Sequence, residues 1–293
     1  VAPLSKTSAT ISGASCAIWD FTTPALEADR LATFIASEMA AHQLSPRDFV
    51  LLVRQKPADY AAVLEPAFLK VGLPLRNEAA IVGKVALQEL LAEEASIFLI
   101  LMLRLATTKR AGRHWTQCQD ALAEEIDTFA RDLIARHPAP VRSAAQARSL
   151  VDEVLDFIGR ARLIATHPAY AQGDWFAKII EACALHLAAS CAGQESWTAA
   201  LDAYEGVHAV PLMTIHKSKG LEYHTVVFVG LDDGAWWSFA GDQVEATAGF
   251  FVAFTRAKQR VAFTYCAQRG ARTKIATLYN LLNAAGVSTE KVA

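Results

Sequence analysis

Several features that would point to particular classes of protein are missing from this sequence of 293 residues. Its five cysteines form no C-x-x-C pair and no Cys/His spacing typical of a metal site. We therefore expect reduced, mostly buried thiols and a cytoplasmic protein. The longest apolar run, residues 97–103, is far shorter than the roughly 20 residues that a membrane span needs, and no signal peptide is visible. No membrane partner is expected.

The charge balance gives no hint of function, and one common phosphate-binding motif is absent. The net charge is −2 and the pI is about 6.5, so any nucleic-acid surface has to be local. No G-x-x-x-x-G-K-[ST] pattern occurs anywhere in the chain. Such a loop cradles the β- and γ-phosphates of a nucleotide and helps to hold Mg²⁺, so the chain does not supply that part of a nucleotide site.

What the sequence does have is an apolar content of 53%, enough for a sizeable core, and a length that allows two domains. Residues 16–21 and 49–53 are predicted strands, and a predicted helix follows each of them. The first helix starts at Thr22-Thr23-Pro24 with threonine as N-cap, and the second covers 57–71, closed by Gly72. Alternating strands and helices favour a parallel sheet and an α/β fold.

Between residues 82 and 204 the pattern is helical and little else, which indicates a helical block inserted into the α/β domain. The expected helices are 84–106, 115–136, 143–166, 173–189 and 195–204. After this block the strand pattern returns at 212–215, 226–230 and 260–266, with helices expected at 246–258 and 273–284.

The stretch PLMTIHKSKGLEYHTVVFVGL, residues 211–231, contains two buried-strand patterns separated by the polar turn 216–222. A packed sheet gains nothing from three bases and a carboxylate in that turn. Because the turn leaves the carboxyl end of a strand, where open α/β sheets bind ligands, the pattern indicates a phosphate site. Taken alone, the same residues also suit a solvated turn with His216 as a surface histidine.

A second stretch, FFVAFTRAK at 250–258, reads as a helix that runs directly into the strand at Arg260. Arg256 lies near the carboxyl end of this expected helix. An arginine directed at a crevice is typical of an arginine finger, which neutralises charge on a transferred phosphoryl group. The alternative is a solvated arginine or an ion pair at a helix end.

Taken together, three segments resemble the UvrD/Rep/PcrA-type helicases of superfamily 1. They are TIHKSKGLEY, VVFVGLDDG and VAFTRA, in that order and with the family's spacing; 48–55, 69–76 and 101–106 also resemble family segments. The resemblance implies a RecA-like parallel sheet flanked by helices, of the P-loop NTPase type but without the P-loop. It also implies an inserted all-α subdomain. The implied division is a flexible lead-in (1–15), a second motor domain in two parts (16–82 and 207–293) and an inserted helical domain (83–206).

The resemblance also implies roles for individual residues on the nucleotide side. Arg256 matches the family arginine that reaches the γ-phosphate of ATP, and Glu222 matches the glutamate that bonds the ribose. Lys219 and Gly220 match positions where the nucleotide and DNA sites meet. A lysine supplies a point charge there, and a glycine lets the backbone approach closely.

On the DNA side, Thr214 and His216 match positions near the DNA backbone, and both are ordinary phosphate partners. Arg54 ends a predicted strand at the ligand-binding edge, where contact with DNA phosphate and a structural ion pair are both open. Three aromatic residues follow the DDG sequence in a predicted loop, namely Trp236, Trp237 and Phe239. They either stack on bases or cover the sheet edge or a neighbouring domain.

The implied activity is that of the C-terminal part of an ATP-dependent 3′→5′ DNA helicase or translocase, inactive alone because the Walker A motor is absent. ATP is the implied cofactor, with Mg²⁺ held by the first motor domain. Implied partners are single-stranded DNA, single-strand/double-strand junctions and the N-terminal motor of the same polypeptide. Two other functions stay open, namely a motor-less DNA- or protein-binding module and the motor part of a helicase–nuclease. Where the family usually carries arginines, this chain has Thr247 and Ala248.

Overall fold

The computed structural model describes residues 15–107, 123–239, 241 and 243–292. The chain divides into two compact units, one made of residues 1–79 and 208–293 and the other of residues 80–207. We call them unit 1 and unit 2, and each is described by itself. Residues 1–14 of the lead-in expected at 1–15 and the start of the helix expected at 115–136 lie outside the described residues.

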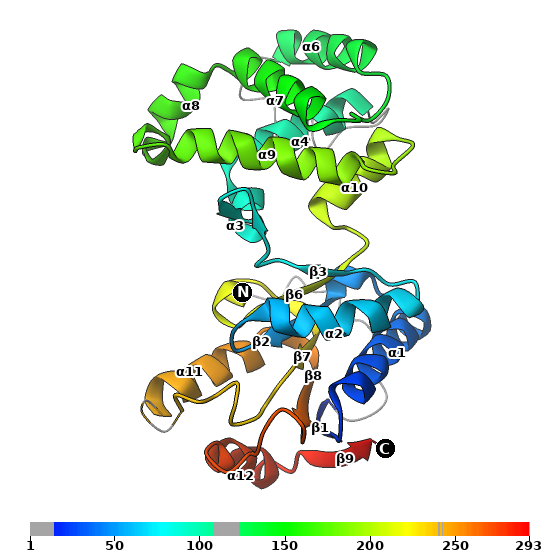
Figure 1. Ribbon diagram of the computed structural model, residues 1–293, viewed down its shortest axis with the longest axis vertical. Coiled ribbons are helices and arrows are strands. Elements are labelled where there is room, and N and C mark those ends of the chain that lie inside the picture. Colours follow the sequence, from blue (N-terminus) through cyan, green and yellow to red (C-terminus); the bar gives the residue numbers. More distant parts are fainter. Residues whose placement is uncertain (1–14, 108–122, 240, 242, 293) are drawn as a thin grey trace. The chain divides into compact units, whose positions relative to one another are not determined.

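Unit 1 is built on a seven-stranded sheet in which every pair of neighbouring strands is parallel, in the order β3-β6-β2-β7-β8-β1-β9 (Figure 1). The strands are β1 (Cys16–Phe21), β2 (Phe49–Val53), β3 (Leu75–Asn77), β6 (Val210–Thr214), β7 (Tyr223–Phe228), β8 (Ala257–Cys266) and β9 (Ser288–Val292). The helices of this unit are α1 (Pro24–His42), α2 (Pro57–Lys70), α11 (Gln243–Phe254) and α12 (Ala276–Ala284), with 3₁₀ turns η1 (Pro46–Asp48) and η3 (His216–Ser218).

The sheet of unit 1 is covered on both faces, as a parallel sheet requires. Phe49, Leu51 and Val53 of β2 pack in a core that includes residues of α1 and α2. Val50 and Leu52 point the other way, into a core that includes residues of α11 and α12. Figure 1 shows α1 and α2 on one side of the sheet and α11 on the other. The predicted RecA-like α/β fold is thereby confirmed.

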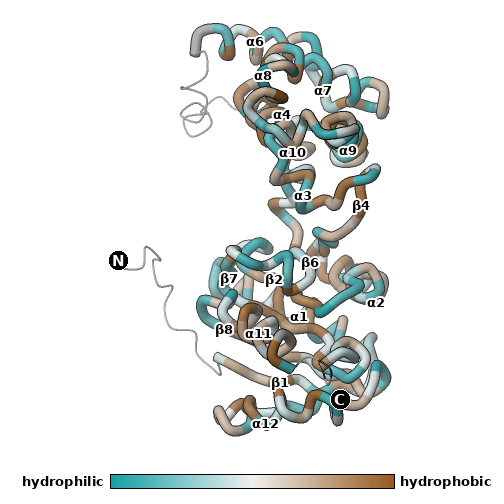
Figure 2. The backbone as a smooth tube through the Cα atoms, turned by 90° about the vertical axis from the view of Figure 1, so that its left-hand side faces the viewer, coloured by the Kyte–Doolittle hydropathy of each residue, from teal (hydrophilic) through white to brown (hydrophobic). Residues whose placement is uncertain are grey.

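The described part of unit 2 is helical apart from a two-stranded antiparallel hairpin, which the sequence did not predict. Its elements are β4 (Ile81–Val82), β5 (Val85–Ala86), α3 (Leu87–Ala92), α4 (Glu94–Thr107), α6 (Ala123–Arg136), α7 (Ala144–Ile158), α8 (Arg160–Thr166), η2 (Pro168–Ala171), α9 (Trp175–Cys191) and α10 (Trp197–Glu205). Buried side chains of α4, α7, α9 and α10 share one core. In Figure 2 the helices of this unit carry alternating brown and teal stretches, as expected for helices with one buried side.

Two expected helices are each divided in the structure. The helix expected at 84–106 begins as β5 and then breaks at Glu93, whose extended backbone separates α3 from α4. The helix expected at 143–166 breaks at Gly159, which adopts φ +93° between α7 and α8. Only glycine adopts that conformation readily, so the break has a local cause. The edge strands β3 and β9 were not predicted, because their short polar sequences carry no apolar run.

The four described cysteines, Cys16, Cys183, Cys191 and Cys266, are free, and all but Cys16 are buried. In the parts of the chain that the structure describes, no helix is long and apolar enough to cross a membrane.

Candidate nucleotide and nucleic-acid site

The residues predicted to contact DNA lie at the carboxyl edge of the sheet in unit 1. β2 and β6 are neighbours, and Val53 pairs with Thr214 at the ends of the two strands. The backbone N–H of Ile215 donates to the carbonyl of Val53 at 3.1 Å. Arg54 follows Val53 directly, so the structure brings Arg54, Thr214 and His216 to neighbouring positions along one edge. His216 is exposed, and Arg54 and Thr214 are partly exposed.

The segment after Thr214 does not stay at that edge. Because β6 and β7 both run parallel to β2, residues 215–222 have to return from the carboxyl edge of the sheet to its amino edge. The buried hydroxyl of Ser218 donates to the carbonyl of Ile215 at 2.7 Å and fixes the first turn of this return. Lys219 and Gly220 are exposed along it. Gly220 adopts φ +85°, and an added Cβ would meet no atom within 4 Å, so the backbone angle, and not lack of space, requires glycine.

Arg256 and Glu222 lie at the amino edge, at the start of β8 and β7. The Arg256 guanidinium makes three local hydrogen bonds, from Nε to the carbonyl of Val252 (3.0 Å), from Nη1 to that of Leu221 (3.2 Å) and from Nη2 to Thr255 Oγ1 (3.0 Å). The backbone N–H of Tyr223 in turn donates to the Arg256 carbonyl at 2.8 Å. The arginine and the residues on either side of Glu222 are therefore bonded to each other.

In the part of the chain that the structure describes, the charged groups around Arg256 include no counterion for its guanidinium. Among the described residues, no carboxylate oxygen lies within 4 Å of the Arg256 guanidinium. Glu222 pairs instead with Lys258, at 3.4 Å between Oε2 and Nζ, and both side chains are well exposed. Arg256 is partly exposed. An oriented guanidinium without a carboxylate partner is suited to an anionic ligand.

One sequence-based expectation about this region was wrong. The helix expected to continue to residue 258 ends at Phe254, and Arg256 lies in the short link before β8. The strand starts early because Ala257 already pairs with Tyr223 of β7. The turn 216–222, whose pattern taken alone indicated a phosphate site, spans both edges of the sheet. The structure separates its residues, with His216 at one edge and Glu222 at the other.

The aromatic residues after the DDG sequence differ strongly in their exposure to solvent. Trp236 and Phe239 are each 1% exposed and pack against the sheet, so for these two the edge-covering alternative is correct. Trp237 is 65% exposed. Arg54, which had two open roles, places its guanidinium carbon 5.4 Å from the centre of the Trp236 ring, a cation–π contact. Among the described residues it forms no ion pair.

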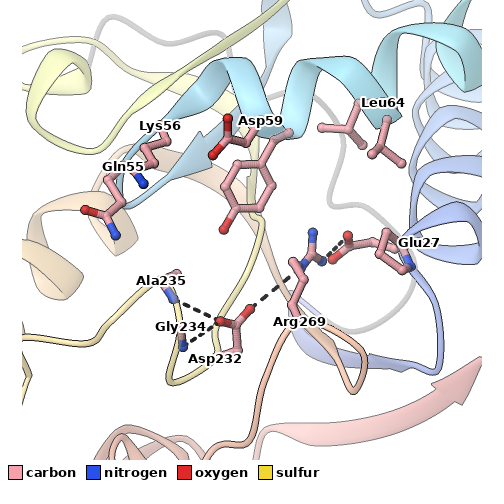
Figure 3. A pocket seen from close by; sticks show the side chains of 12 residues that line it. Glu27, Gln55, Lys56, Asp59, Leu64, Asp232, Gly234, Ala235 and Arg269 are labelled. Carbon is pink, nitrogen blue, oxygen red and sulfur yellow. Dashed lines mark hydrogen bonds and ion pairs between the residues drawn. The ribbon is translucent and has the colours of Figure 1, made fainter.

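A cavity of about 360 Å³ lies at the carboxyl edge of the sheet, and the sequence did not predict it (Figure 3). Its floor holds two buried acids, Glu27 and Asp232, on either side of Arg269. Arg269 forms a close ion pair with Glu27 and lies 3.6 Å from Asp232. Burial raises the pKa of the Tyr60 phenol in the cavity wall to about 12, and the nearby Arg269 acts in the opposite direction. Phenol and guanidinium therefore both carry their protons at neutral pH.

Only part of that cavity left a signal in the sequence. Glu27 occupies a position on the apolar side of the first helix, where a carboxylate is unusual and indicates a buried partner. Asp232 belongs to the DDG sequence, whereas Arg269 lies in a loop with no periodicity. Among the residues that the structure describes, no group of three or more His, Cys, Asp or Glu side chains could hold a metal ion.

Comparison with known proteins supports the family suggested by the motifs. The chain is 39% identical over 64 residues to the ATP-dependent DNA helicase Rep of Buchnera aphidicola subsp. Schizaphis graminum, covering 20% of this chain and 10% of the relative. It is also 39% identical over 90 residues to the putative ATP-dependent DNA helicase YjcD of Bacillus subtilis, covering 27% of this chain and 12% of that protein. The matched part of this chain thus spans about a tenth of the length of these relatives.

The family model for the UvrD-like helicase C-terminal domain matches residues 105–268, more than half of the chain. The match runs from the last residues of α4 through the rest of unit 2 and ends just after β8. It therefore includes much of the helical block, which the sequence motifs left almost uncovered. It also includes the connection 215–222 and Arg256, the residues whose geometry is described above. The chain belongs to the UvrD-like helicase C-terminal domain family.

Proposed function

We propose that this chain supplies the second motor of an ATP-dependent 3′→5′ DNA helicase or translocase. The observation that carries the proposal is the bonded unit at the amino edge, in which Arg256 is oriented by the Leu221 carbonyl beside Glu222. Its support is the family membership and the names of the relatives, which are described as ATP-dependent DNA helicases. We further propose that residues 16–82 and 207–293 form one motor domain and that 83–206 is an inserted helical domain.

On the nucleotide side, we assign Arg256 to the γ-phosphate of ATP and Glu222 to the ribose. A guanidinium that has no carboxylate partner among the described residues offers its charge to a phosphoryl group, and a carboxylate accepts from a sugar hydroxyl. Lys219 and Gly220 lie next to them on the exposed return segment. ATP with Mg²⁺ supplies the phosphoryl-transfer chemistry, and we assign the Mg²⁺ to a first motor domain. The residues here form one wall of such a site, so we expect no ATP turnover by the chain alone.

On the DNA side, we assign Arg54, Thr214 and His216 to the backbone of single-stranded DNA, including the single strand at a junction with a duplex. Guanidinium, hydroxyl and imidazole groups along one sheet edge are suited to consecutive phosphates. Residues 215–222 then connect the DNA side with the nucleotide side. We propose that this segment couples the two.

The proposal is tested in a polypeptide that joins this chain to a first motor domain carrying a P-loop. We expect ATP hydrolysis that single-stranded DNA stimulates. Substituting Arg256→Ala is expected to lower turnover by roughly 10³- to 10⁵-fold, with DNA affinity nearly unchanged. Arg256→Lys tests the guanidinium shape, because lysine keeps the charge but not the fork.

The matched control is Arg131→Ala, which removes an exposed arginine of unit 2 whose partner is Asp127 in the same helix. It is expected to leave turnover unchanged. Normal DNA-stimulated turnover in the Arg256→Ala protein would refute the arginine-finger role. DNA binding without any turnover in the joined polypeptide would instead favour a binding module without a motor.

A further inference from the structure

Trp237 stands apart from the other aromatic residues of its loop. It is 65% exposed, whereas Trp236 and Phe239 on either side of it are 1% exposed. An exposed indole adds no hydrophobic stabilisation to the fold, and Trp236 and Phe239 already cover the sheet edge. A structural role in the core therefore does not account for Trp237.

The position of this indole is set by its surroundings. Its Nε1–H donates to Gln55 Oε1 at 3.5 Å, which links the loop to the residue two places after the end of β2. The preceding residue of the loop, Trp236, is held by the guanidinium of Arg54 at 5.4 Å. Two contacts from consecutive residues after β2 thus hold the loop, and Trp237 is presented at the carboxyl edge of the sheet.

The charges beside Trp237 favour a polyanion. Arg54 and Lys56 follow β2 at this edge, and among the described residues neither has a carboxylate oxygen within 4 Å. Lys56 is exposed and adopts φ +48°, a conformation that costs a non-glycine residue about 1 kcal/mol or more. It occupies the N-cap of α2 without a capping hydrogen bond from its side chain.

The charges of the adjacent carboxyl-edge cavity indicate on which side of Trp237 the phosphates would lie. Its lining includes the acids Glu27, Asp59 and Asp232 against the cations Lys56 and Arg269, so phosphate is disfavoured inside it. Phosphates are favoured on the side of Arg54, next to Thr214 and His216. The flat face of an indole next to such a row of cations is the arrangement that binds unpaired bases.

We propose that Trp237 is a base-stacking residue for single-stranded DNA whose phosphates contact Arg54 and Lys56. The proposal rests on the proposed function, which places single-stranded DNA along this edge, and it adds the residue that contacts the bases. Because every base has a π face, this contact holds the strand without reading its sequence.

The test measures binding of a fluorescein-labelled oligo-dT of about 15 nucleotides to the 293-residue chain by fluorescence anisotropy. Trp237→Ala is expected to raise Kd by about 5- to 100-fold, the range for loss of one stacked base. Trp237→Phe is expected to retain most of the affinity. The matched control is Phe251→Ala, since Phe251 on α11 is also 65% exposed, and it is expected to leave Kd unchanged.

Two further measurements separate stacking from charge. On an abasic oligomer of the same length, Trp237→Ala is expected to have no effect, while Arg54→Ala still weakens binding. Against salt, Arg54→Ala is expected to reduce the slope of log K by about 0.7, and Trp237→Ala to leave the slope unchanged.

The outcomes distinguish this inference from the function it rests on. Salt-dependent binding that Arg54→Ala weakens but Trp237→Ala does not would overturn the stacking role and leave the DNA-binding edge standing. An equal loss on abasic and base-bearing DNA would overturn it as well. Absence of binding in every protein at low salt would overturn both proposals.

Discussion

Gly230 follows the end of β7 and touches the wall of the carboxyl-edge cavity, and its replacement by alanine is expected to destabilise unit 1. Two separate costs add up. At φ +83° a residue with a Cβ pays about 1–2 kcal/mol. The added Cβ would also lie 2.5 Å from the Tyr60 hydroxyl oxygen and 3.1 and 3.2 Å from two of its ring carbons, so the ring has to move. Overpacking of this kind costs about 1–3 kcal/mol, giving roughly 2–5 kcal/mol in total.

A double-mutant cycle separates the two costs. In a Tyr60→Ala background the overlap disappears, so Gly230→Ala should cost only the backbone part, about 1–2 kcal/mol. Gly72→Ala is the matched control, because Gly72 adopts φ +71° with nothing within 4 Å of an added Cβ. It should also show the backbone cost alone. Native-state hydrogen exchange of the buried strands β7 and β8 measures the free energy of unfolding of unit 1 separately from that of unit 2.

The reasoning about Gly230 would be refuted by two results. Equal costs of Gly230→Ala with tyrosine and with alanine at position 60 would show that the overlap contributes nothing. A cost no larger than that of Gly72→Ala in the wild-type background would show the same independently.

Two predictions concern pH. Asp233 accepts hydrogen bonds from the backbone N–H groups of Thr273 and Lys274 and from the Thr273 hydroxyl, and although partial burial opposes it, these bonds lower its pKa. The contribution of this carboxylate to the free energy of unfolding should be complete above the unfolded pKa of 3.8 and should be lost as the pH falls through the lower folded pKa. Asp233→Ala should therefore lower the free energy of unfolding by about 1–2 kcal/mol at pH 7 and by less in acid, as measured by urea unfolding. Burial lowers the pKa of His224, so the unfolded state takes up its proton first, and stability should fall as the pH drops below 6.5, by at most about 1.4 kcal/mol per pH unit. His224→Gln should flatten this dependence in urea titrations at about pH 5.5 to 7.5; an unchanged slope would rule out His224 as its source.

The sequence predicted the central part of the fold because its central strands are continuous apolar runs. FVLLV in β2 and the core of β7 are buried on both faces, and such runs between helices are typical of parallel sheets. Edge strands have no such requirement. β9, with the sequence STEKV, is almost fully exposed, so its pairing with β1 depends on the backbone and left no pattern in the side chains.

The individual roles of loop residues could not be predicted for a related reason. In a strand or helix, periodicity tells which side chains face the core, but a loop has no period. Trp236 and Trp237 are adjacent and chemically identical, yet one is buried and the other exposed. Trp236 packs against the rings of Phe228 and Phe250, and it also contacts the guanidinium of Arg54, which lies more than 180 residues earlier in the chain. Contacts of this kind depend on the order of the strands, which local sequence does not encode.

The same limit applies to the turn that the sequence presented as a single phosphate site. Proximity in sequence suggested one cluster from His216 to Glu222. However, β6 and β7 are parallel and lie on either side of β2, so the chain between them has to cross from the carboxyl edge of the sheet to its amino edge. Its first residue is bonded to the end of β2 through Val53, beside Arg54. Its far end is bonded to Arg256 through the carbonyl of Leu221 and the N–H of Tyr223. The segment is therefore linked to both proposed ligand sites, by backbone–backbone bonds at Ile215 and Tyr223 and by the Leu221 carbonyl, which accepts from the Arg256 side chain. A change in its length by one residue should consequently disturb both edges together, whereas Arg54→Ala and Arg256→Ala should each disturb one.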